Sequence, residues 1–126
     1  MLDLIVNELN KNDIKCFIDV VPNEIDRKKP FAMVSCETSE NEHTSCEVIH
    51  TDQFIVYVFN GVQNELNAVK ELYDKINDIL KNIKSDINYT VIDYLTQELS
   101  YKFVGFKSQH IKVYESKVEF IYEKRL

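Results

Sequence analysis

The chain has 126 residues, of which 44% are hydrophobic and 29% charged, and its length and composition predict one folded domain over residues 1–126 rather than a disordered chain. The elements below predict the α+β class, with a mostly antiparallel sheet, a short N-terminal helix and one long amphipathic helix packed on the sheet. Lys and Arg number 15 against 21 Asp and Glu, so the net charge of −6 argues against nonspecific binding to a phosphate backbone. With only 2 glycines and 2 prolines, the sequence excludes a glycine-rich phosphate loop and a proline-rich ligand segment.

The N-terminal segment predicts a short amphipathic helix. Its apolar residues recur at the spacing of one helical face and are Leu2, Ile5, Val6 and Leu9. The segment lacks a basic n-region and its apolar run is interrupted, so we expect neither a signal peptide nor a membrane span, and a cytosolic origin. Three cysteines in such a chain indicate reduced thiols rather than a disulfide framework.

Three strands are predicted in the first half of the chain. Residues 14–21 are rich in β-formers and end at Pro22, and residues 31–36 form a second strand after Pro30. Residues 37–47 are acidic and polar, which predicts a loop. Residues 48–59 predict a long third strand that is apolar on both faces near its end. Both faces of this strand are therefore expected to be covered by other parts of the structure.

A long amphipathic helix is predicted directly after the third strand. The apolar stripe at helical spacing consists of Val62, Leu66, Val69, Tyr73, Ile76, Leu80 and Ile83. Asn60 and Gln63 resemble a capping box, which would start the helix at the Asn60-Gly61 pair. The helix then provides the cover for one face of the third strand.

The last third of the chain predicts further strands. Residues 88–94 alternate enough to form a strand, and residues 101–106 either continue it or begin another, which leaves the path of residues 97–114 open. Residues 117–123 alternate clearly and predict a half-exposed strand, with Ile121 on its polar face. A neighbouring subunit is one possible cover for Ile121 and for the second face of the third strand.

Four residues have the chemistry of zinc ligands within a short span: Cys36, His43, Cys46 and His50. Their spacing matches no paired zinc-knuckle motif, so the sequence favours buried cysteines and loop-flanking histidines, and no metal site is predicted.

No catalytic motif is present, and we predict no catalytic residue, no cofactor and no enzymatic activity. Glu98 and Glu115 are nominal acid/base candidates, but 21 acidic residues make such a pair uninformative. His110, near a strand start, is expected at the surface or in a hydrogen bond.

The 7 Tyr and 7 Phe are not interleaved with Lys or Arg, except at residues 101–103, so they favour a core and a subunit interface over nucleic-acid stacking.

The order of these elements resembles the tail terminator, or tail completion, proteins of long-tailed bacteriophages and phage-derived tail particles. The resemblance rests on the opening helix and on three segments, PFAMVSCE, DQFIVYVFNGVQNELNAVKELYDKINDIL and VEFIYEKRL. It is strongest over residues 48–83 and 117–123. These are hydrophobic signatures and not catalytic motifs.

The resemblance implies a structural virion protein at the tail–neck junction, assembled in the host bacterial cytoplasm. Six copies would form a ring that caps the tail tube, ends its polymerisation and presents a surface to the head connector. The implied partners are the tail tube protein, the head–tail connector and, if the tail is contractile, the sheath protein. Genomic DNA would pass through without specific binding, and no membrane is involved.

Several alternatives remain open from the sequence. The chain is compatible with another neck or head-completion connector of the same particle, with a small non-catalytic binding module, and with an enzyme or small-molecule binder whose pocket the sequence does not reveal. A further alternative is a metal-binding module that uses Cys36, His43, Cys46 and His50. Under the tail-terminator hypothesis, residues 37–47 are a candidate flexible arm that orders on contact with a partner. Deleting them is then expected to leave folding intact and to weaken attachment to the tube.

Overall fold

The computed structural model describes residues 1–22, 29–43, 48–65, 67–83, 85–86, 88–96 and 101–124. In these ranges it has a mixed, mostly antiparallel sheet and two helices, which confirms the predicted α+β class. In chain order, the elements are α1 (Leu2–Lys11), β1 (Cys16–Ile18), β2 (Phe31–His43), β3 (Val48–Gly61), α2 (Asn67–Lys81), β4 (Tyr89–Thr96), β5 (Lys102–Ser108) and β6 (Ile111–Lys124).

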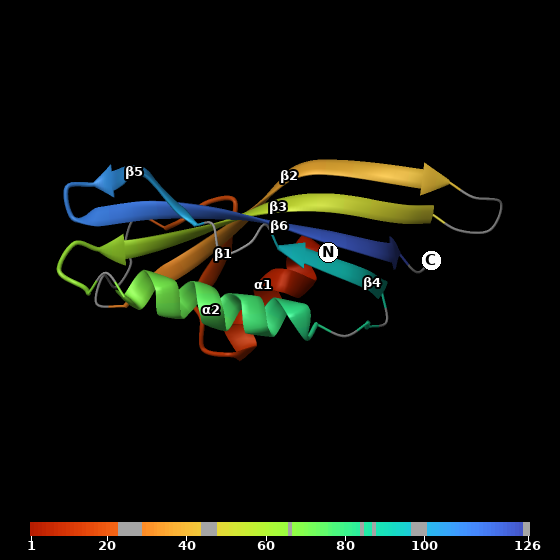
Figure 1. Ribbon diagram of the computed structural model, residues 1–126, viewed down its shortest axis with the longest axis horizontal. Helices are drawn as coiled ribbons and strands as arrows, with labels where there is room; N and C mark the ends of the chain where they lie inside the picture. Colours follow the sequence, from red (N-terminus) through yellow and green to blue (C-terminus); the bar gives the residue numbers. More distant parts are fainter. Residues whose placement is uncertain are drawn as a thin grey trace.

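The sheet is built around two long central strands, β3 and β6, in the order β1-β2-β3-β6-β4. Strand β1 runs parallel to β2, and the other pairs are antiparallel. Strands β4 and β5 share one edge of β6, with β4 beside residues 118–124 and β5 beside residues 111–115. Figure 1 shows the resulting strongly twisted sheet, in which the ends of β2 and β3 extend past both helices.

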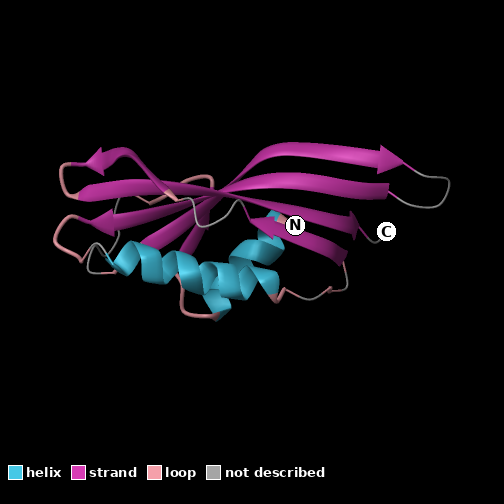
Figure 2. Cartoon of the chain, viewed as in Figure 1, coloured by secondary structure: helices cyan, strands magenta, loops and turns pink. Residues whose placement is uncertain are grey.

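Both helices lie on the same face of the sheet (Figure 2). Helix α2 buries Val69, Tyr73, Ile76 and Leu80 against that face, as its apolar stripe predicts. Phe54 and Phe120 are fully buried beneath the helices, and each such side chain contributes about 1.5–3 kcal/mol through removal from water. Among the described residues, neither helix is long and apolar enough to cross a lipid bilayer.

The sequence predicts that both faces of β3 need cover and leaves open which face meets the long helix, and the structure covers one face more than the other. Phe54, Val56 and Val58 point to the helices and are buried, whereas Ile55 and Tyr57 are half-buried on the opposite face. At one end of that open face a small second cluster forms around Phe31, Phe59 and Ile111, with the rings of Phe31 and Phe59 stacked at 4.9 Å. The rest of the open face has no covering element in the described part of the chain.

The end of α1 is fixed by a Schellman motif. The Ile14 amide donates to the Leu9 carbonyl at 3.0 Å, and the Asp13 amide donates to Asn10 at 3.3 Å. Asp13 has a φ of 62°, the left-handed conformation that this motif places directly after the helix. Ile14 and Leu9 are both buried, so the motif turns the chain from α1 into β1 without exposing apolar surface.

The predicted start of the long helix is wrong. Helix α2 begins at Asn67, so Asn60 and Gln63 do not form its capping box. The Asn60 side chain is instead buried in the preceding turn, where it donates to the Glu65 carbonyl at 3.4 Å and accepts from Asn64 at 3.0 Å. The side-chain amide therefore holds the turn that separates β3 from α2.

Several strand boundaries also differ from prediction. Strand β1 is limited to Cys16–Ile18, because Asp19 has a φ of 58°, which is incompatible with an extended strand. Residues 37–43 are not a loop but the outer part of β2, paired with β3 as far as the His43 and Val48 register. Residues 44–47 lie outside the described residues. Residues 102–108 are a separate strand, β5, which resolves the open path for that segment.

Candidate interaction surfaces

The outer parts of β2 and β3 form a two-stranded arm beyond the helices (Figure 1). The exposed side chains of the β2 part are polar or acidic, including Glu37, Ser39 and Glu40. The register changes between Cys36 and Thr38, and this bulge lies where the arm leaves the helix layer. The arm is therefore a polar projection that is fixed to the sheet by its backbone ladder.

A buried carboxylate lies at the base of this arm. Asp52 is 6% exposed and accepts hydrogen bonds from Ser39 Oγ at 2.6 Å and from the Tyr122 hydroxyl. Burial, followed by the bond to Asp52, raises the pKa of Tyr122 well above its usual value. The His50 ring stacks on Tyr122 at 5.1 Å. This cluster joins β2, β3 and β6 and gives the arm a fixed direction.

Strand β5 carries an exposed apolar patch. Phe103, Val104 and Phe106 are 50%, 44% and 58% exposed, and the rings of the two phenylalanines meet edge to face at 5.4 Å. Gly105 between them has a φ of 147°, a conformation that glycine adopts without strain, and the register with β6 shifts on both sides of it. The bulged strand thus displays three large apolar side chains to solvent.

The open face of the sheet beyond the second cluster carries charged pairs on β6. Glu115 accepts from Lys102 at 3.3 Å, and Lys117 reaches Glu37 at 3.1 Å. Ile121 is half-buried on this face, as its position among polar residues predicts. The face is mixed in character and does not have the uniform positive charge that nucleic-acid binding requires.

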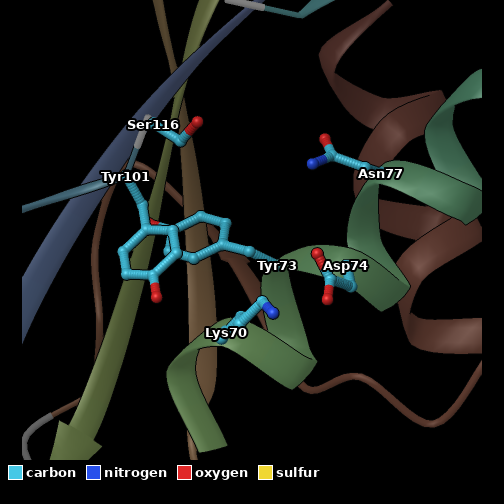
Figure 3. A pocket seen from close by; sticks show the side chains of 6 residues that line it. All are labelled: Lys70, Tyr73, Asp74, Asn77, Tyr101 and Ser116. Atoms are coloured by element: carbon cyan, nitrogen blue, oxygen red, sulfur yellow. The ribbon is translucent and has the colours of Figure 1, made fainter. Parts of the chain in front are cut away.

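A cleft of about 340 Å³ separates α2 from β6 (Figure 3). Its lining residues are Lys70, Tyr73, Asp74, Asn77, Tyr101 and Ser116. The Tyr73 and Tyr101 rings stack at 4.9 Å, and the Tyr73 hydroxyl donates to the Val56 carbonyl at 2.9 Å. Burial raises the pKa of Tyr73 far above its usual value. That hydroxyl is thus held as a structural donor and is unsuited to act as a base.

The four residues with zinc-ligand chemistry are not brought together in the described part of the chain. Cys36 pairs in register with Phe54, whereas His50 pairs with Asn41, several positions further out along the arm. Cys46 and the side chain of His43 lie outside the described residues. No group of three or more metal-binding side chains occurs among the residues that were described.

The structure describes one of the two nominal acid/base residues. Glu115 forms an ion pair with Lys102, and Glu98 lies outside the described residues. His110 is exposed in the turn before β6, where its amide donates to Ser108 Oγ at 3.2 Å.

The aromatic residues divide between core and surface. Most lie in the core, including Phe54, Tyr114 and Phe120, whereas Phe103 and Phe106 are exposed on β5. Sequence reasoning proposed both a core and an interface role but did not separate them. The sequence does contain a signal that distinguishes the exposed aromatic residues from those of the core. Phe103 and Phe106 lie on a strand that contains a glycine, is flanked by lysines and lacks a regular alternation of apolar and polar residues.

Neither a protein-family model nor a curated protein sequence matches this chain. Among solved structures, the fold is similar to that of a chain in a structure described as "Virion of native gene transfer agent (GTA) particle". The TM-score is 0.61 at 9% sequence identity, and the match covers 94% of this chain and 84% of that chain. The two chains therefore share a fold over nearly their whole length.

Proposed function

We propose that this chain is a structural component of a phage-like particle and that it acts as the tail terminator. In this role six copies form a ring that caps the tail tube, ends its polymerisation and joins the tail to the head connector. The observation that carries the proposal is the fold shared with a gene transfer agent virion chain over 94% of the present chain. The sequence resemblance to tail terminators supports the more specific role.

The distribution of surface features is consistent with this role. Closed rings need two different contact patches on each subunit. The polar arm at the end of β2 and β3 and the apolar patch on β5 are two such patches of different chemistry, and they lie on different parts of the sheet (Figure 1). The fold shared with a virion chain supports a role in assembly rather than an enzymatic one.

The proposed partners are the tail tube protein, the head–tail connector and, in a contractile particle, the sheath protein. DNA would pass through the ring. With a net charge of −6 per copy, the ring would not retain a polyanion by charge alone. Recognition of the tube would then depend on shape, strand edges and apolar contacts.

The test is to mix the purified chain with polymerising tail tube protein from the same particle. We expect tube length in electron micrographs to fall as the chain is added, with a ring at one tube end and a hexameric mass by light scattering. Tube protein alone provides the control. Unchanged tube lengths together with binding to the portal-side ring would replace the terminator role with that of a connector.

A further inference from the structure

Two strand edges of the sheet have no neighbour among the described residues. Strand β1 pairs with β2 only from Ala32 to Val34, so within the described part of the chain no strand pairs with the outer edge of β2 over residues 35–43. Strand β5 pairs with β6 on one side, and no described strand lies on its other side. Such edges offer rows of backbone donors and acceptors that can pair with another chain.

The edge at β5 is apolar and basic. Phe103, Val104 and Phe106 are each at least 44% exposed, and the charged residues of the strand are Lys102 and Lys107. Single exposed apolar side chains are ordinary on a protein surface, but the rings of Phe103 and Phe106 meet at 5.4 Å and form one exposed apolar patch. The strand contains no acidic residue.

The edge at β2 has the opposite charge. The sequence contains no Lys or Arg from Phe31 to Gln53, and Glu37 and Glu40 are exposed on the outer part of β2. Glu37 is bonded to Lys117 of the same chain at 3.1 Å. Glu40 makes no ion pair within the described residues, so its charge is available to a partner.

Charge decides between the possible pairings of these edges. Joining two β2 edges would bring acidic residues together, and joining two β5 edges would bring lysines together, and both arrangements are destabilising. Pairing β5 with β2 places unlike charges side by side. The lengths also agree, because the seven residues of β5 fit within the unpaired stretch of residues 35–43.

We propose that the free edge of β5 in one copy pairs with the outer edge of β2 in the next copy and continues the sheet across the subunit boundary. The contact joins two different surfaces, so repeating it generates a closed ring or a filament, as the proposed hexamer needs. The inference rests on the proposed ring, whose contacts it assigns.

A charge exchange tests the pairing. We expect Glu40→Lys and Lys107→Glu each to raise the concentration for half-assembly about fivefold, as measured by sedimentation velocity, because each places like charges in the contact. The double variant should return to within about twofold of the original chain, because it restores unlike charges. Glu71→Lys, on the exposed side of α2, is the control for a change of net charge and should have no specific effect on assembly.

A second pair of variants tests the apolar part of the contact. Phe106→Ser should weaken assembly at least about tenfold, since the side chain is 58% exposed in the single chain and would become buried in the contact. The matched control is Leu95→Ser, which removes a 46% exposed side chain from β4, next to β5 along the same edge of β6. Melting curves of every variant show whether the fold is retained.

The outcomes separate this inference from the proposed function. Rings that form on tube ends but are unaffected by Glu40→Lys, Lys107→Glu and Phe106→Ser overturn the pairing and leave the terminator role intact. Self-assembly that depends on these residues, without any effect on tubes, supports the pairing and removes the terminator role. A chain that stays monomeric at every concentration, with and without tubes, overturns both.

Discussion

At the residue scale, the Asp52 cluster is the clearest departure from an ordinary apolar core. A carboxylate that is 6% exposed is stable only with strong donors, and Ser39 and Tyr122 supply them. The described part of the chain contains no buried side-chain polar atom without a hydrogen-bond partner. The three residues come from three strands. The hydrogen bonds that stabilise the buried charge of Asp52 therefore also hold these strands together and fix the direction of the arm.

Removing the Tyr122 hydroxyl is therefore expected to destabilise the chain. In Tyr122→Phe, Asp52 loses one of its two donors while it stays buried, and we expect the free energy of unfolding to fall by about 1–3 kcal/mol in urea titrations. Tyr57→Phe is the matched control. The Tyr57 hydroxyl makes no hydrogen bond within the described residues, so that change should stay within about 0.5 kcal/mol. Equal effects in the two variants would contradict a structural role for the cluster.

Cys16 provides a prediction about pH. Burial raises the pKa of its thiol from the ordinary value of 9.0 to about 12. Because the folded-state value is the higher one, this contribution to stability is complete below pH 9 and is lost as the pH rises from 9 to 12. Over that interval the free energy of unfolding should fall by up to about 1.4 kcal/mol per pH unit from this group.

The Cys16→Ser variant isolates that contribution. Serine does not titrate in this range, so unfolding curves between pH 9 and 10 should show a smaller pH slope, although the variant is less stable overall. Cys36→Ser, at an exposed thiol, serves as the control and should retain most of the slope. An unchanged slope in Cys16→Ser would assign the alkaline instability to other groups.

At the element scale, the sequence predicted best where one face of an element is buried. Phe120 and Tyr122 alternate with polar residues, and the structure buries both under the helices. The stripe of α2 was equally clear. In these segments the hydrophobic period is imposed by contact with the core, so the period by itself indicates the type of element.

The segments that sequence reasoning missed lack that contact. The outer part of β2 extends beyond the helices, and the side chains of residues 37–41 are all exposed, so no alternation marks this segment as a strand. Backbone pairing with β3 and the bond from Ser39 to Asp52 hold it in place. The start of α2 was missed because Val62 continues the apolar stripe but lies exposed in the turn.

The arm also changes the expected result of a deletion. Deleting residues 37–47 would remove strand pairs and the Ser39 donor, so folding would not be left intact. A cleaner variant replaces residues 41–50 by Asn-Gly, because Glu40 and Thr51 are register partners that a two-residue turn can join. We expect it to stay folded, losing no more than about 2 kcal/mol of unfolding free energy, because the described residues removed are not core residues.

The shortened arm is expected to bind tube ends at least about tenfold more weakly in co-sedimentation, because strand edges and shape then contribute less contact. Replacing Gln109 and His110 by Asn-Gly alters the exposed turn between β5 and β6 and is the control. Full tube binding by the shortened arm would exclude the arm as the tube contact and would leave the open sheet face as the remaining surface, because the edge of β5 is assigned to the neighbouring copy.

At the scale of the whole molecule, the net charge and the charges of the two strand edges have opposite effects on association. The net charge of −6 opposes the association of identical copies at long range, whereas the proposed contact joins an acidic edge to a basic one. Association by this route becomes specific for orientation, because only the β2-to-β5 arrangement relieves the repulsion. The same excess of acidic residues also determines whether the proposed ring binds DNA.

The ring of six copies that we propose is expected not to bind duplex DNA. Nonspecific binding to DNA at physiological salt typically has a Kd of about 10⁻⁴ to 10⁻⁶ M and requires cations that displace counterions from the phosphates. Six copies with a net charge of −6 each lack that excess. Fluorescence anisotropy of a labelled duplex should therefore stay flat up to about 100 µM ring at physiological salt. Binding that weakens steeply with added salt would reveal a basic lumen and would assign the ring a part in holding the genome end.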